Sequence, residues 1–121
     1  MKPSSRIFLV DRGCDEFVEK YFSTFDTVRH FLINFYANEA ILLWNGNGIN
    51  FDSLNAFFAQ IPASYHIVES YDTHPVSSDT FLIHVNGSVQ YGELLKQFSQ
   101  TFLLKQDSKT KIISDHFRFL N

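Results

Sequence analysis

Histidines and carboxylates are the residues of this chain that could carry acid–base or metal chemistry. The sequence of 121 residues holds 5 histidines and 13 acidic residues. They match no catalytic or metal-binding motif, since the chain has no His-Glu-x-x-His, no Gly-x-Ser-x-Gly and no phosphate-binding loop. Asp72 and His74 share a strand face, but an acid–base pair also needs a pocket that excludes water. We therefore predict no catalytic residue, no cofactor and no metal site.

The cysteine count and the net charge exclude further classes of function. The only cysteine, Cys14, rules out a disulfide framework, and its place on an apolar helix face predicts a core residue rather than a nucleophile. A net charge of −3 gives no basic surplus for a phosphate backbone, so we expect no direct binding of nucleic acid. The apolar run Ile7–Val10 is too short for a signal sequence or a membrane span, so we expect no membrane partner.

Apolar residues at helical spacing predict three helices in the first half of the chain. The first covers residues 7–25, and Asp26 is the expected cap of a second, shorter helix. A third helix, capped by Asp52 or Ser53, is expected to end at Pro62, because proline cannot continue a helix.

Turn residues divide the remainder into strands. Two Asn-Gly pairs in residues 45–48 predict a tight hairpin, and the glycine of Asn86–Ser88 indicates a turn or bulge. No linker or repeat interrupts the chain, so we predict one domain, residues 1–121. The expected architecture is α+β, with three N-terminal helices on one face of a curved antiparallel sheet. Its last four strands are expected near residues 64–74, 80–91, 97–105 and 110–119.

The strands carry apolar residues on both faces. Ile83 belongs to the face with most of the apolar residues, whereas Leu82 and Leu103 belong to the other. Alternation along the last strand assigns Ile113 to the first face and Ile112 to the second. A face that mixes apolar and charged residues suits contact with a partner protein. The alternative is a second layer formed by the chain's own loops.

Arg118 is the charged residue that this pattern singles out. It lies between Phe117 and Phe119 and points to the opposite strand face. An arginine in this position either extends to water or pairs with a carboxylate across an interface.

The element order and several strings resemble the nuclear transport factor 2 superfamily, a cone of three helices on a curved sheet. No single string is diagnostic, but together they follow the family's order and spacing, most closely that of its small export proteins. The matching strings are Phe17–Phe22, Ala40–Asn47, Leu54–Pro62, Asp72–Val76, Phe98–Leu104 and Ser114–Phe119.

This resemblance implies an interface on the outer face of the sheet. Small export proteins pair there with the nuclear transport factor 2-like domain of the large messenger-RNA export receptor. Arg118 matches the arginine that is expected to form a salt bridge with an aspartate of the receptor. Asp72, His116 and Leu103 are the other interface candidates. Losing one partner of such a desolvated pair costs about 2–5 kcal/mol.

The resemblance also implies a role. The chain would be a non-enzymatic subunit that stabilises the receptor's matching domain and supports binding of nucleoporin Phe-Gly repeats during mRNA export. It would shuttle between nucleus and cytoplasm and be found at the nuclear envelope and pore, while messenger RNA would bind elsewhere in the complex.

Two alternatives belong to the same superfamily. A homodimeric import carrier holds GDP-bound Ran with acids around its cone mouth, but Asn45 replaces one of them and Glu93 is what remains of another acidic run. An enzyme on the same fold would place residues such as His66, Tyr91 or Asp115 in its pocket. Large apolar residues are expected to close that pocket here.

Overall fold

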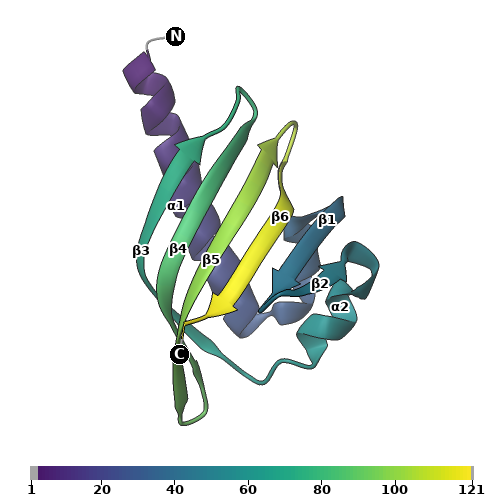
Figure 1. Cartoon of the computed structure of the whole chain (residues 1–121). Coiled ribbons are helices and arrows are strands. Elements are labelled where there is room, and N and C mark those ends of the chain that lie inside the picture. Colours follow the sequence, from purple (N-terminus) through teal and green to yellow (C-terminus); the bar gives the residue numbers. More distant parts are fainter. Residues whose placement is uncertain (1–2, 121) are drawn as a thin grey trace.

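The computed structural model describes residues 3–120, with side chains from Gly13 onward. In this range the order of elements follows the prediction, with three helices and a hairpin preceding four strands (Figure 1). No described helix is both long and apolar enough to cross a membrane. The elements are α1 (Pro3–Thr27), the 3-10 helix η1 (Arg29–Phe35), β1 (Tyr36–Trp44), β2 (Asn47–Asn50), α2 (Phe51–Ala59), β3 (Tyr65–Pro75), β4 (Thr80–Tyr91), β5 (Leu94–Gln106) and β6 (Thr110–Phe119).

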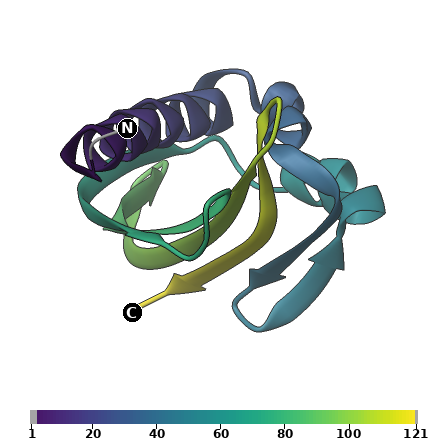
Figure 2. The same cartoon turned by 90° about the horizontal axis from the view of Figure 1, so that it is seen from above.

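The strands form one curved sheet in the order β2-β1-β6-β5-β4-β3, with α1 across its concave side (Figure 2). Neighbouring strands are antiparallel except β1 and β6, so the predicted antiparallel sheet is in fact mixed. This parallel pair joins the first strand to the last, a long-range pairing that local sequence patterns do not reveal. Trp44 supports it by stacking on its register partner Phe117, with ring centroids 3.9 Å apart. The predicted α+β architecture is otherwise confirmed.

Aromatic side chains from α1 and from the inner face of the sheet fill the core. Tyr21 is fully buried and packs edge-on against Phe102, with ring centroids 4.8 Å apart. Cys14 is also fully buried, which confirms its predicted place in the core. The other buried residues of α1 recur at the predicted helical spacing, namely Phe17, Val18, Phe22 and Phe25.

The hairpin between β1 and β2 turns at Asn45 and Gly46. Both residues have positive φ, 50° and 86°, which a tight hairpin turn requires and which Asn and Gly tolerate. The second Asn-Gly pair lies within β2 instead. Asn45 also holds the end of β6, because its N–H donates to the Phe117 carbonyl (2.8 Å) and its Oδ1 accepts from the Phe119 N–H (2.9 Å).

The predicted helix caps were wrong at both short helices. No side chain caps η1, which follows Val28. The Asp26 carboxylate instead contacts Ser64 and His66. The cap of α2 is Asn50, whose Oδ1 accepts from the Ser53 N–H at 3.2 Å. Asn50 leaves β2 with an extended backbone, the conformation that an N-cap residue needs. The helix then ends at Ala59, before Pro62.

Bulges in β6 and β3 reset the side-chain alternation. Leu103 pairs with Ser114 and Leu104 with Ile112, so Ile113 is the extra residue. Ile112 is consequently fully buried, and the sequence-based assignment of Ile113 to the core face was wrong. In β3 the extra residue is Glu69, which lies opposite Asn86 and Gly87. The bulge thus lies in β3, opposite the Asn86–Ser88 segment in which the sequence predicted a turn or bulge.

A substitution at Gly87 tests the close approach of β3 to β4. A Cβ at this position would lie 2.3 Å from the Ile67 carbonyl oxygen, so we expect Gly87→Ala to lower the free energy of unfolding by about 2–3 kcal/mol. Gly13→Ala is the matched control, since its Cβ would meet nothing within 4 Å and alanine favours a helix by about 1 kcal/mol. Urea unfolding measures both, and equal stabilities of the two variants would contradict the packing.

Candidate protein interface and buried polar cluster

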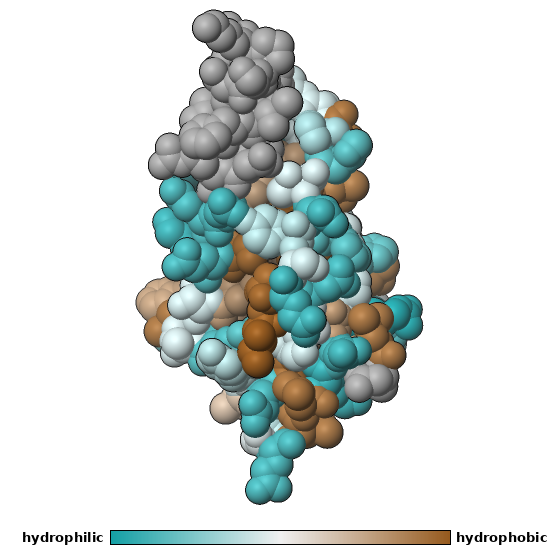
Figure 3. Space-filling view, turned by 90° about the vertical axis from the view of Figure 1, so that its left-hand side faces the viewer, coloured by the Kyte–Doolittle hydropathy of each residue, from teal (hydrophilic) through white to brown (hydrophobic). Residues whose placement is uncertain are grey.

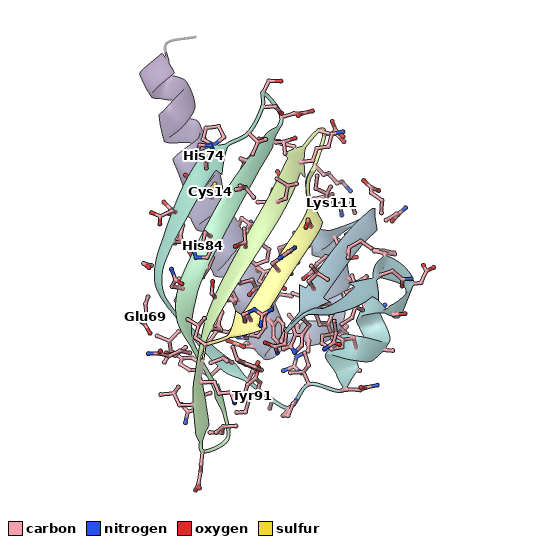
Figure 4. The ribbon with its side chains drawn as sticks, in the orientation of Figure 1. Cys14, Glu69, His74, His84, Tyr91 and Lys111 are labelled. Carbon is pink, nitrogen blue, oxygen red and sulfur yellow. The ribbon has the colours of Figure 1, made fainter. Side chains whose placement is uncertain are left out.

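The outer face of the sheet, opposite the helices, consists of cross-strand rows of side chains. His74 and His84 lie on this side, which faces the viewer in Figure 4 while α1 passes behind. The register aligns three rows across β3, β4, β5, β6 and β1. They are His74–Leu82–Leu103–Ser114–Ile41, then Asp72–His84–Thr101–His116–Leu43, and Ser70–Asn86–Ser99–Arg118.

The outer face brings together all four residues predicted for an interface. Asp72 and His116 share the middle row, and Leu103 and Arg118 lie in the rows on either side. The rows combine apolar side chains with isolated polar and charged ones, as in protein interfaces. Among the described elements, the helices lie on the inner face, so no second layer from the chain covers this one (Figures 1 and 2).

Arg118 is exposed at the edge of the outer face. Its partner in register is Ser99, and its Nη2 approaches the hairpin turn, where a Cβ on Gly46 would be 4.0 Å away. The guanidinium makes no hydrogen bond or ion pair with the described part of the chain. The flanking rings of Phe117 and Phe119 point inward, so in this stretch of β6 the arginine alone lies on the outer face.

His84 is an outer-face residue that sequence reasoning did not assign to the interface. Its Nδ1 lies 2.7 Å from Thr101 Oγ1 and its Nε2 3.4 Å from Ser99 Oγ, so β5 fixes the ring in place. His84 lies two residues after Leu82, and this spacing along a strand could have assigned it to the same outer face. Its neighbours Asp72 and Thr101 depend on the strand register, which the sequence alone does not give.

A buried polar cluster lies on the inner face, directly behind the interface rows. Asp115 is 0% exposed, and its Oδ2 accepts from the Tyr36 hydroxyl at 2.7 Å and from the Tyr21 hydroxyl at 3.5 Å. Its Oδ1 accepts from Gln100 Nε2 at 2.9 Å, and the two tyrosine hydroxyls lie 2.6 Å apart. Each polar group of the cluster thus has a partner, as burial requires.

Burial dominates the electrostatics of this cluster. Desolvation raises the pKa of Asp115 to about 6, although hydrogen bonds from Tyr36, Gln100 and Tyr21 lower it in part. Burial and the nearby charge of Asp115 also raise the pKa of each tyrosine well above its ordinary value. A carboxyl with this environment could serve as a proton donor if a substrate reached it. Asp115 lines neither of the two hollows described below.

Asp26 and His66 form a second polar contact that joins α1 to β3. Asp26 Oδ1 lies 2.7 Å from His66 Nδ1 and accepts from Ser64 Oγ at 2.8 Å, while Oδ2 accepts from the His66 N–H. Burial acts to raise the pKa of Asp26, but the hydrogen bonds from His66 and Ser64 outweigh it and lower the pKa. The carboxylate therefore anchors the start of β3, which explains why it does not cap η1.

The mouth of the cone keeps a hollow of about 400 Å³. Trp44, Phe57, Tyr91 and Phe119 line it, and the buried Tyr91 hydroxyl has no hydrogen-bond partner. Large apolar side chains therefore narrow the pocket without closing it, contrary to expectation. His66 lines a different hollow, so His66, Tyr91 and Asp115 do not meet at one enzyme pocket.

Among the described side chains, from Gly13 onward, no group of three or more histidine, cysteine or acidic residues could hold a metal ion.

Comparisons with known proteins agree with this geometry. A model of the nuclear transport factor 2 (NTF2) domain matches residues 13–119. NTF2-related export protein 2 of Homo sapiens is 38% identical over 126 residues, covering 91% of this chain and 89% of that protein. The Mtr2–Mex67 M domain complex of C. albicans has a TM-score of 0.76 at 14% identity, with 90% of this chain and 93% of that chain covered. A putative scytalone dehydratase from Novosphingobium aromaticivorans has a TM-score of 0.84 at 11% identity, with 98% and 89% covered.

The helices on one face of a curved mixed sheet define an NTF2-like fold, which the structural neighbours share. That fold alone does not show whether a protein is an enzyme, because one of these neighbours is a putative dehydratase. The sequence matches go further, and this chain belongs to the nuclear transport factor 2 family. The family resemblance of the sequence is thereby confirmed.

Asp115→Asn tests the buried cluster through the pH dependence of stability. Because the pKa of Asp115 rises from 3.8 to about 6 on folding, its contribution is fully present below about pH 4 and is lost as the pH rises to about 6. We expect the free energy of unfolding of the wild type, relative to Asp115→Asn, to fall by roughly 3 kcal/mol between about pH 4 and pH 7.

Urea titrations at each pH measure this difference. Asp72→Asn, at an exposed position, is the matched control and should give a nearly constant difference from the wild type. A constant difference for Asp115→Asn as well would show that the buried carboxyl does not titrate in this way.

Proposed function

We propose that this chain is the small, non-enzymatic subunit of a nuclear export receptor heterodimer. The single observation that carries the proposal is the outer face, which is uncovered by the described chain and carries an exposed, unpaired Arg118. The similarity to NTF2-related export protein 2 supports an export role, and the fold of the Mtr2–Mex67 complex supports a partner of the same fold.

The partner should present a sheet face of its own to these rows. Leu103, Leu82 and Ile41 form an apolar row that a partner would remove from water. Arg118 would then meet a carboxylate of the partner, and a guanidinium can hold a carboxylate by two parallel hydrogen bonds. His116 and Asp72 would lie in the same contact, one row from Leu103.

The wider role follows from this assembly. The chain would stabilise the matching domain of the large mRNA export receptor and support its binding of nucleoporin Phe-Gly repeats. With a net charge of −3, the chain itself would not hold messenger RNA. We expect it to shuttle between nucleus and cytoplasm and to be found at the nuclear pore.

The residues at the mouth of the cone support the import-carrier alternative less well than the export role. Asn45 occupies the position where the import carrier is expected to have an acid, and its side chain holds the Phe119 N–H. It is therefore a structural residue of the sheet rather than a free acceptor for Ran.

Arg118→Asp tests the proposed interface. The substitution replaces an attraction by a repulsion, and loss of a desolvated charge pair costs about 2–5 kcal/mol, so the dissociation constant for the receptor's matching domain should rise roughly 30-fold to several thousand-fold. Calorimetric titration of the purified chains measures it.

Lys20→Asp provides the matched charge reversal on α1, on the other side of the sheet, and should leave the affinity unchanged. Circular dichroism should show both variants folded. An Arg118→Asp protein that binds the receptor domain as tightly as the wild type would refute the assigned interface.

A further inference from the structure

A groove between α1 and β3 forms a surface separate from the outer face. It has a volume of about 550 Å³, and Val18, Phe22, Val68 and Tyr71 provide its apolar walls. Figure 3 looks at this edge of the molecule, where hydrophobic side chains run between hydrophilic ones on either side. The groove residues His66, Val68 and Tyr71 of β3 point inward, away from the interface rows.

The groove runs along a free sheet edge. β3 is the terminal strand, with β4 on one side and no strand on the other within the described chain. A free edge offers backbone N–H and C=O groups to an added strand, and peptides bind many proteins in this way. The His66 N–H at the start of the edge already donates to Asp26. An added strand would therefore pair with β3 from Val68 onward, beside the Glu69 bulge.

The charged residues that line the groove are acidic, apart from any charge on His66. The acids are Asp15, Glu19 and Asp26, and no lysine or arginine lines the groove. Asp26 is engaged by His66, whereas Asp15 and Glu19 are exposed on α1 without a salt bridge among the described residues. These two carboxylates stand at i and i+4, where like charges repel and destabilise a helix. A cation bound between them would relieve that repulsion.

We propose that this groove binds an extended segment of a partner protein in which a lysine or arginine flanks a large apolar residue. The segment adds along the open edge of β3, its apolar side chain rests on Phe22 and Val68, and its cation meets Asp15 and Glu19. Charge complementarity selects this occupant over an acidic or a purely apolar peptide. Because the outer face remains free, the segment and the proposed receptor domain bind together.

Selection of a phage-displayed library of random dodecapeptides on the full chain tests the proposal. The enriched peptides should combine basic and large apolar residues, and a synthetic copy should bind in fluorescence anisotropy. Asp15→Asn/Glu19→Gln should weaken that binding about tenfold, since two partly exposed charge pairs are lost. Hydrogen exchange should slow at Val68–Tyr71 when the peptide binds.

Two controls separate this groove from the outer face. Glu16→Gln/Glu39→Gln changes the net charge equally at exposed positions that do not line the groove and should leave the affinity unchanged. Arg118→Asp should also leave it unchanged. Selection that yields no peptide sensitive to Asp15→Asn/Glu19→Gln, or peptides lost in Arg118→Asp, would overturn the groove proposal without touching the export heterodimer.

Discussion

A single layer of helices can cover only one face of a sheet, and this constraint organises the whole molecule. The core lies between α1 and the concave face, where aromatic rings and the Asp115 cluster are buried. The convex face has no cover from the described part of the chain, and Leu82 and Leu103 remain partly exposed there. Burial of apolar area against a partner is therefore the physical drive for assembly. The proposed heterodimer follows from that incomplete cover.

Buried hydrogen bonds fix the position of β6, whose other side carries the interface residues. Asp115 fixes the strand from the inside through Tyr21 of α1, Tyr36 of β1 and Gln100 of β5. Asn45 fixes the strand end through the backbone of residues 117 and 119, on either side of Arg118. These contacts fix the backbone that carries Arg118 before a partner arrives, so binding has to order only its side chain.

Local patterns in the sequence were sufficient to predict the helices, the hairpin and the sheet face of Arg118, His116 and Leu103, whereas the face of Asp72 was not assigned. Period-two alternation placed Arg118 and Leu103 on the outer face, because it depends only on neighbouring residues. Features that depend on distant partners were not predictable. The parallel pairing of β1 with β6, the bulge at Ile113 and the contact of Asp26 with His66 all join residues far apart in the chain. The cluster around Asp115 was missed for the same reason.

We propose that the uncovered sheet face binds a partner of the same fold. Light scattering coupled to size exclusion tests it most directly, with the chain alone and co-expressed with the nuclear transport factor 2-like domain of the mRNA export receptor. Co-expression should give a complex with one copy of each chain. A stable homodimer that ignores the receptor domain would contradict it.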